Sequence, residues 1–101
     1  MIDFRDEDQK TVFTYFAKSL GNDFALSVGQ QKKEITNSTE ATNLTNFYWQ
    51  MVDEAALADK NNQVIDGVLG MQPIMEDLIN IIGGYLERCG FGDEWDADDE
   101  N

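Results

Sequence analysis

Residues 37–58 read NSTEATNLTNFYWQMVDEAALA, and this stretch decides the fold. Its apolar residues recur at spacings of three and four, which is the repeat of one face of an α-helix. The residues on this face are Ala41, Leu44, Tyr48, Met51, Ala55 and Ala58. Asn37 followed at the third position by Glu40 is typical of a helix start. The sequence therefore predicts a long amphipathic helix from Asn37 that breaks at Asn61-Asn62.

The segments on either side carry the same helical repeat. Residues 6–20 predict a helix whose apolar residues form one stripe. Its first three residues are acidic, which suits the positive end of a helix, and Gly21-Asn22 ends it. Residues 64–69 predict a short helix, although Gly67 and Gly70 weaken it. The sequence thus contains at least two helices that can pack on the central one.

A last helix is predicted before Gly90, with Pro73 in its first turn. Its apolar residues are Met75, Leu78, Ile82, Tyr85 and Cys89, with Met71 upstream. Gly83-Gly84 falls inside this helix, where each glycine costs about 1 kcal/mol relative to alanine. We therefore expect either a closely crossing helix or a kink at this pair.

Residues 24–36 are ambiguous. Phe24, Leu26 and Val28 alternate as in a strand, and Gly29-Gln30-Gln31-Lys32 could turn the chain into a second strand with Ile35. The expected class is therefore mostly α, with three to four helices around a helical hairpin. A short β-hairpin at 24–36 would make the class α+β, and a loop is the other alternative.

The composition of the chain limits its possible functions. The 101 residues suffice for one domain, which we place at 1–92. There is no His and one Cys, so imidazole general bases, His-ligated metals, thiolate zinc sites and intrachain disulfides are excluded. The acidic pairs Asp53-Glu54 and Glu76-Asp77 predict solvated faces rather than carboxylate metal centres, because adjacent helical residues diverge by about 100°. We therefore expect no enzyme, no cofactor and no metal.

The net charge of −13 restricts the partners. Phosphate backbones and anionic membrane surfaces would repel the chain, so we expect neither direct nucleic-acid binding nor membrane binding. The N-terminus lacks the basic and apolar regions of a signal peptide, and no run of 18 apolar residues occurs. We expect a cytoplasmic protein, bacterial or viral, that binds a protein with a basic surface.

Residues 93–101 contain six acidic side chains and no basic one. We expect this segment to be a mobile acidic tail. It is either a solubilising terminus or a recognition segment anchored by Phe91 and Trp95, and Trp95 could also fold back onto the core. The alternation in residues 96–100 resembles the start of a calcium loop, but the glycine and the final glutamate of such a loop are missing.

Phe47-Tyr48-Trp49 places three aromatic residues in different directions on one helix. Tyr48 falls on the apolar face and Phe47 beside it, whereas Trp49 falls among polar residues. We expect Trp49 either to be covered by the N-terminal segments or to await a partner. Cys89 is interpreted as a small apolar residue at the end of its helix.

In composition the chain resembles many phage-encoded inhibitors and DNA mimics, which are small, acidic and poor in His, but no motif carries this resemblance. The resemblance implies a decoy that occupies the basic nucleic-acid site of a host protein. The candidate partner-binding residues are Asp53, Glu54, Asp59, Asp66, Glu76, Asp77, Glu87, Trp49, Trp95, Asp96, Asp98 and Asp99.

The alternative function is a small oligomeric structural or assembly adaptor or chaperone that binds protein through its aromatic and Met-rich helical faces, while the charge only maintains solubility. Met51, Met71 and Met75 are adaptable packing residues that suit such a surface and suit a core equally well. A homodimer would also satisfy the apolar seams of the helices. Salt separates the two hypotheses, because a decoy loses affinity as ionic strength rises and an apolar adaptor does not.

Overall fold

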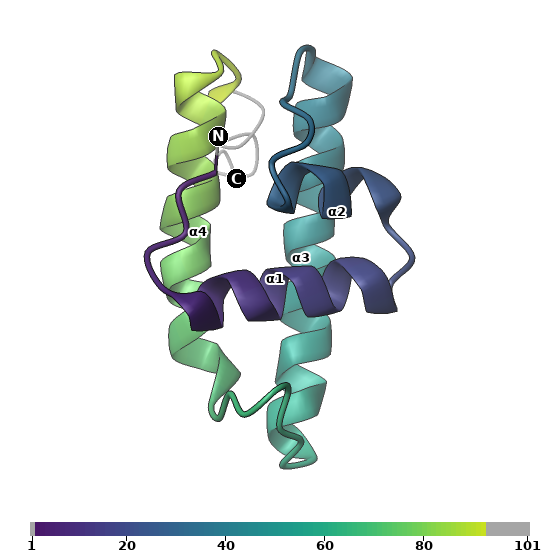
Figure 1. The fold of residues 1–101 in the computed structure, drawn as a ribbon, viewed down its shortest axis with the longest axis vertical. Coiled ribbons are helices and arrows are strands. Elements are labelled where there is room, and N and C mark those ends of the chain that lie inside the picture. The colour runs from purple at the N-terminus through teal and green to yellow at the C-terminus, as the bar shows by residue number, and fades with distance from the viewer. Residues whose placement is uncertain (1, 93–101) are drawn as a thin grey trace, which may run out of the picture.

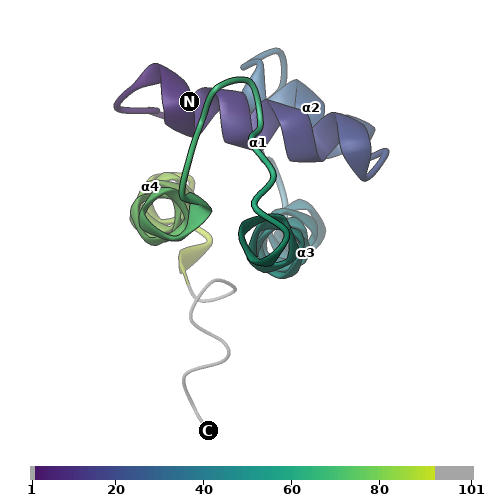
Figure 2. The same ribbon diagram turned by 90° about the horizontal axis from the view of Figure 1, so that it is seen from below.

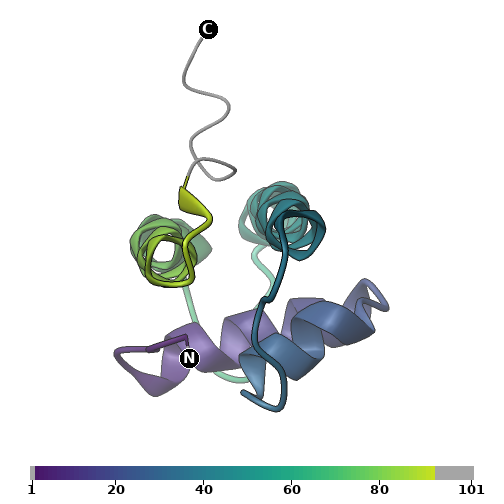
Figure 3. The same ribbon diagram turned by 90° about the horizontal axis from the view of Figure 1, so that it is seen from above.

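The computed structural model describes residues 2–92, and these form four helices with no strand. The helices are α1 (Glu7–Ser19), α2 (Asp23–Gly29), α3 (Ser38–Lys60) and α4 (Met71–Arg88). The helices α3 and α4 lie side by side and antiparallel, and α1 crosses both of them (Figure 1). Seen along the hairpin, α1 and α2 form one layer and α3 and α4 the other (Figures 2 and 3). The predicted mostly-α class with a helical-hairpin core is confirmed.

Helix α1 has the bounds that its capping residues predict. The carboxylate of Asp6 accepts a hydrogen bond from the Gln9 backbone N–H at 3.1 Å, and Gly21 ends the helix in the left-handed region at φ 67°. The buried stripe consists of Gln9, Val12, Phe13, Phe16 and Ala17. Phe13 lies edge-on to Phe4 and to Phe47 of α3, so α1 and α3 share one aromatic core.

The β-hairpin considered at 24–36 is wrong. The side chain of Asn22 caps α2 by accepting a hydrogen bond from the Ala25 N–H at 2.9 Å, and the helix continues to Gly29. Its buried residues are Ala25, Val28 and Gly29, which is helical spacing. Packing against α1 decides the outcome, because Gly29 lies directly against the ring of Phe13.

Helix α3 confirms the long amphipathic helix predicted from Asn37. The Asn37 side chain accepts a hydrogen bond from the Glu40 N–H at 2.9 Å, and the Glu40 carboxylate accepts one from the Thr36 N–H at 2.9 Å. Lys33 forms an ion pair with Glu40 at 2.9 Å, which lowers the pKa of that carboxyl group. Every predicted apolar position of this helix is at most 4 % exposed.

The short helix predicted at 64–69 is wrong. Asp66 and Gly67 both have positive φ, at 49° and 85°, and the Val68 N–H donates to the Ile65 carbonyl at 2.8 Å. An Asp-Gly pair favours such a tight turn, because both central residues must adopt left-handed angles. Ile65 and Val68 pair across the turn and are both buried. The turn therefore buries the apolar residues whose spacing suggested a helix.

Helix α4 begins at Met71 with Pro73 in its first turn, and Gly90 follows its end at φ 89°, as predicted. The expected close crossing does not occur at Gly84: among residues 2–92, no atom of another helix lies within 4 Å of a Cβ placed there, and the side-chain neighbour is Arg88 Nη1 of the same helix, at 3.5 Å. Gly83 is buried. The two glycines of the pair therefore lie in different environments.

Candidate functional site

The fold separates the charges of the chain into two layers. Residues 1–37, which include α1 and α2, carry six acidic and five basic side chains, a net charge of −1. Residues 38–90, which contain α3, α4 and the turn between them, carry eight acidic and two basic side chains, a net charge of −6, or −5 without Asp66, which lies against α1. The uneven charge along the sequence thus becomes an uneven charge in space, with one nearly neutral layer and one acidic layer.

One side of the α3–α4 layer faces away from α1. Phe47 and Asp77 point toward α1, since they contact Phe13 and Gln9 respectively. Successive residues of a helix are rotated by about 100° about its axis, so the directions of Phe47 and Asp77 determine which residues lie on the opposite side. We call this side the outer face. Its exposed or half-exposed residues include Trp49, Val52 and Asp53 of α3 and Glu76, Ile79 and Glu87 of α4, whereas Gly83 and Leu86 on the same side are buried. No helix of residues 2–92 lies over it (Figures 2 and 3).

The acidic candidates do not all lie together. Asp53, Glu76 and Glu87 are exposed and belong to the outer face, where they flank an apolar row. Glu54 is exposed on α3, at the edge nearer to α1. Asp66 lies elsewhere, because the turn at 65–68 carries it to the surface of α1. Trp95, Asp96, Asp98 and Asp99 lie outside the described residues.

Two acidic candidates take part in the fold itself. Asp59 is half-buried, and both of its carboxylate oxygens accept the Met71 backbone N–H, at 2.9 and 3.1 Å. Asp77 accepts a hydrogen bond at 3.2 Å from the side-chain amide of the buried Gln9. Both partners lie more than ten residues away in sequence, so helical periodicity carries no signal for either role.

Trp49 is 44 % exposed, so neither α1 nor α2 covers it. Its ring lies edge-on to Tyr48, with ring centroids 5.1 Å apart. Tyr48 is buried and donates its hydroxyl to the Met75 carbonyl of α4 at 3.1 Å. Burial raises the pKa of Tyr48, and the charge of Glu76 raises it further. Tyr48 therefore fixes α3 to α4, and Trp49 stands beside it at the surface.

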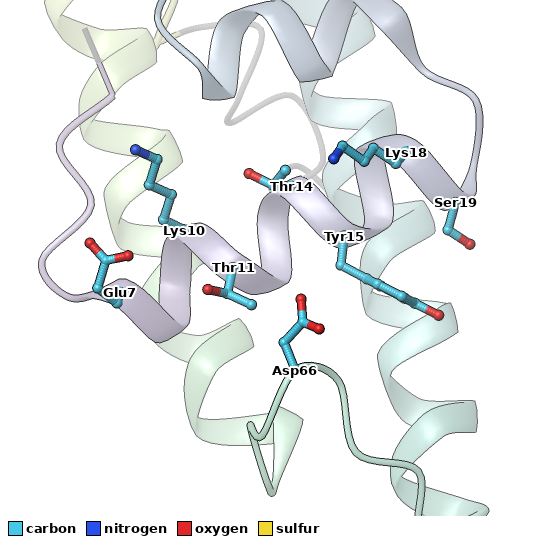
Figure 4. Close-up of a pocket in the computed structure, with 8 residues that line it drawn as sticks. All are labelled: Glu7, Lys10, Thr11, Thr14, Tyr15, Lys18, Ser19 and Asp66. Atoms are coloured by element: carbon cyan, nitrogen blue, oxygen red, sulfur yellow. The ribbon is translucent and has the colours of Figure 1, made fainter.

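A surface depression of about 530 Å³ lies on α1, and it was not predicted from the sequence. Its lining residues are Glu7, Lys10, Thr11, Thr14, Tyr15, Lys18, Ser19 and Asp66. Figure 4 shows Asp66 reaching toward α1 from the turn, with Thr11 and Tyr15 on either side of it. Apart from Asp66, the lining residues all belong to α1. In the sequence they could be recognised only as the polar side of this helix.

Tyr85 and Cys89 lie at the other end of α4. The Tyr85 hydroxyl accepts a hydrogen bond from the buried Ile35 N–H at 3.2 Å, and burial raises the pKa of Tyr85 to about 12. Cys89 is a free, half-buried thiol that packs against the core, which agrees with its interpretation as a small apolar residue. This cluster fastens the linker before α3 to α4.

Within residues 2–92, no group of three or more His, Cys, Asp or Glu side chains is placed to hold a metal ion. None of the helices described is long and apolar enough to cross a membrane. The chain matches no protein-family model, and comparisons with curated proteins and with solved structures found no similar chain.

Proposed function

We propose that this chain is a non-enzymatic binding protein that presents its acidic α3–α4 layer to a basic protein surface. The observation that carries the proposal is the separation of charge between the layers: with Asp66 counted beside α1, the α3–α4 layer carries −5 and the α1–α2 layer −2. A field of one sign on one side orients a charged partner during encounter and raises the association rate. The exposed Trp49 supplies an aromatic anchor beside Asp53 on the same layer.

The finer form of the proposal is a decoy of the DNA-mimic type. In that case the carboxylates of the outer face replace phosphates in the basic site of a nucleic-acid-binding protein. The exposed carboxylates that no described hydrogen bond or ion pair occupies are the strongest candidates for this contact, namely Asp53, Glu54, Glu76 and Glu87. Asp59 and Asp77 are weaker candidates, because each already accepts a hydrogen bond within the fold.

The burial of the methionines favours this proposal over the adaptor. Met51, Met71 and Met75 are at most 3 % exposed, so a Met-rich binding face is absent from the described surface. What remains for an apolar adaptor is a scatter of exposed side chains: Tyr15, Trp49, Leu57, Val64 and Leu69. Isolated exposed apolar residues are ordinary on soluble proteins.

The test is capture of host proteins at about 50 mM salt, elution at about 500 mM salt, and competition of the eluted partner with duplex DNA, since ion pairs at a surface are screened over this range. A decoy must bind a nucleic-acid-binding protein and must be displaced by DNA. Glu76→Lys should weaken this binding, while Asp23→Lys, an equal charge change at an exposed residue of α2, should not. A partner that resists both salt and DNA would contradict the proposal.

A further inference from the structure

The depression on α1 is formed by two distant parts of the chain. The exposed side of α1 is its floor, and the turn at 65–68 is one of its edges. Both ends of this turn are anchored, because Ile65 and Val68 are at most 5 % exposed. Asp66 has φ 49°, an uncommon angle for a residue with a Cβ, and its side chain reaches over α1 between Thr11 and Tyr15 (Figure 4). The turn therefore holds this carboxylate in place beside the helix.

The side chains around the depression offer hydrogen-bonding groups that the fold does not use. Four of the eight lining residues carry hydroxyl groups, two carry ammonium groups and two carry carboxylates. Among residues 2–92, none of these eight side chains forms a hydrogen bond or an ion pair. Ammonium groups donate, carboxylates accept, and hydroxyl groups do both. A ligand that can use the whole set must therefore donate and accept hydrogen bonds.

The ring of Tyr15 adds an apolar surface between these polar groups. The residue is 42 % exposed, and its ring lies edge-on to the ring of the buried Phe16, with ring centroids 5.1 Å apart. Tyrosine combines an apolar ring with a polar hydroxyl group. The contact with Phe16 holds the ring, so it presents a flat surface against which the C–H groups of a ligand can pack.

The charges of the depression favour a ligand without net charge. The ammonium groups of Lys10 and Lys18 balance the carboxylates of Glu7 and Asp66. An anionic ligand would be repelled by the two carboxylates and by the chain's net charge of −13. A cationic ligand would be drawn instead to the α3–α4 layer, where the excess of acidic side chains is larger. A neutral ligand meets neither of these opposing effects.

We propose that this depression binds a neutral saccharide of one or two sugar units. Sugar hydroxyl groups both donate and accept, and sugar rings have a C–H face that can pack on the Tyr15 ring. Asp66 accepts from hydroxyl groups at one edge of α1. Lys10 and Lys18, about 12 Å apart along the helix, donate to oxygens at the other edge (Figure 4). The volume of about 530 Å³ is within the usual range of small-ligand sites, about 300–1,000 Å³.

This site does not depend on the proposed function, because the outer face points away from α1. The test is an NMR titration of the isotope-labelled full chain with glucose, galactose, mannose, N-acetylglucosamine, maltose, cellobiose and lactose. Each is added up to about 50 mM, so that dissociation constants in the millimolar range are detected. At least one of them should shift the backbone amides of residues 10–19 and 65–68 to saturation. The proposal is overturned if none does, or if the shifts lie elsewhere.

Glucose 6-phosphate is the matched probe for charge. It differs from glucose by one phosphate group, and it should bind no more tightly than the neutral sugars because the carboxylates of Glu7 and Asp66 repel it. Binding of the phosphorylated sugar alone would identify an anion site and would contradict the proposal.

Two variants locate the contact. Tyr15→Ser removes an exposed ring and should raise the dissociation constant at least about fivefold, as is usual for an aromatic anchor. Asp66→Asn keeps a residue that tolerates left-handed angles, and the loss of the charged acceptor should raise the constant about fivefold. Leu57→Ser and Asp23→Asn, at exposed residues outside the depression, are the controls. An affinity that is the same in Tyr15→Ser as in Leu57→Ser would refute the site.

Discussion

Asp59, in the last turn of α3, caps the first turn of α4 by accepting the Met71 N–H with both carboxylate oxygens, at 2.9 and 3.1 Å. The residue at the N-cap position of α4 is Gly70, which has no side chain to supply this acceptor. The cap is therefore delivered from the neighbouring helix, and it fixes the lower end of the hairpin across twelve residues of sequence (Figure 1).

Removing this cap should destabilise the fold. Asp59→Ala leaves the Met71 N–H without its acceptor, and the expected loss in the free energy of unfolding is about 1 kcal/mol, the usual value for a lost N-cap. Urea unfolding followed by circular dichroism measures it. Asp53→Ala is the matched control, because Asp53 is an exposed acidic residue of the same helix. Equal stability of the two variants would contradict the capping role.

Gly29 should not tolerate a side chain. A Cβ at this position would lie 2.6 Å from two ring carbons of Phe13, which is fully buried and held between Phe4 and Phe47. Gly29→Ala should therefore lower the free energy of unfolding by about 1–3 kcal/mol, the usual range for an overpacked core.

A double-mutant cycle checks the cause of that loss. In a Phe13→Leu background the aromatic ring is gone, so Gly29→Ala should cost less than it does in the natural chain. Additive effects of the two substitutions would mean that the collision with Phe13 is not the reason for glycine at this position.

Gly84 is a helix position where alanine should be stabilising. The Cβ would make ordinary contact with Arg88 Nη1 at 3.5 Å, and glycine inside a helix is less favourable than alanine by about 1 kcal/mol. Gly84→Ala should raise the midpoint of urea unfolding accordingly. A lower midpoint would show that this position requires glycine for a reason other than space around its Cβ.

Stability should fall at alkaline pH through Tyr85. Its pKa is raised from 10.0 to about 12 by burial, so the folded state holds the phenol proton more tightly than the unfolded chain does. The resulting stabilisation is present below pH 10 and is lost as the pH rises from about 10 to about 12.

Urea unfolding at several alkaline pH values, together with tyrosinate absorbance, measures this loss. Tyr85→Phe should flatten the part of the pH dependence that Tyr85 causes, while the exposed Tyr15→Phe should not. At neutral pH Tyr85→Phe should also be less stable, because the buried Ile35 N–H loses its acceptor. A pH dependence that is the same in both variants would contradict the assignment to Tyr85.

Local chemistry explains which elements could be predicted. Asp6 and Asn37 cap their helices with acceptors three residues from the donors they satisfy, and the stripe from Ala41 to Ala58 needs only helical geometry. Residues 24–36 and 64–69 could not be predicted in this way. A short apolar run fits a helix, a strand or a turn equally well, and the contact between Gly29 and Phe13 or the left-handed angles of Asp66-Gly67 decide between them.

The candidate site residues likewise include some that the sequence predicts and some that depend on tertiary contacts. Periodicity alone placed Asp53, Glu54, Glu76 and Glu87 on polar helix faces, and all four are exposed. The roles of Asp59 and Asp77, the position of Asp66 against α1 and the exposure of Trp49 depend on which helix lies beside which. No sequence spacing encodes these contacts.

By itself, the sequence determined that the chain forms long amphipathic helices, where they start and how the charge is divided along the chain. These properties follow from contacts within a few residues and from the count of ionisable groups. Only the tertiary structure decided that α1 and α2 cover one side of the α3–α4 hairpin, so that the division of charge along the chain becomes a division between two layers. The physical reason is that burial of the apolar stripes requires helices to pack, while the choice of packing depends on side-chain shapes brought together from distant parts of the chain.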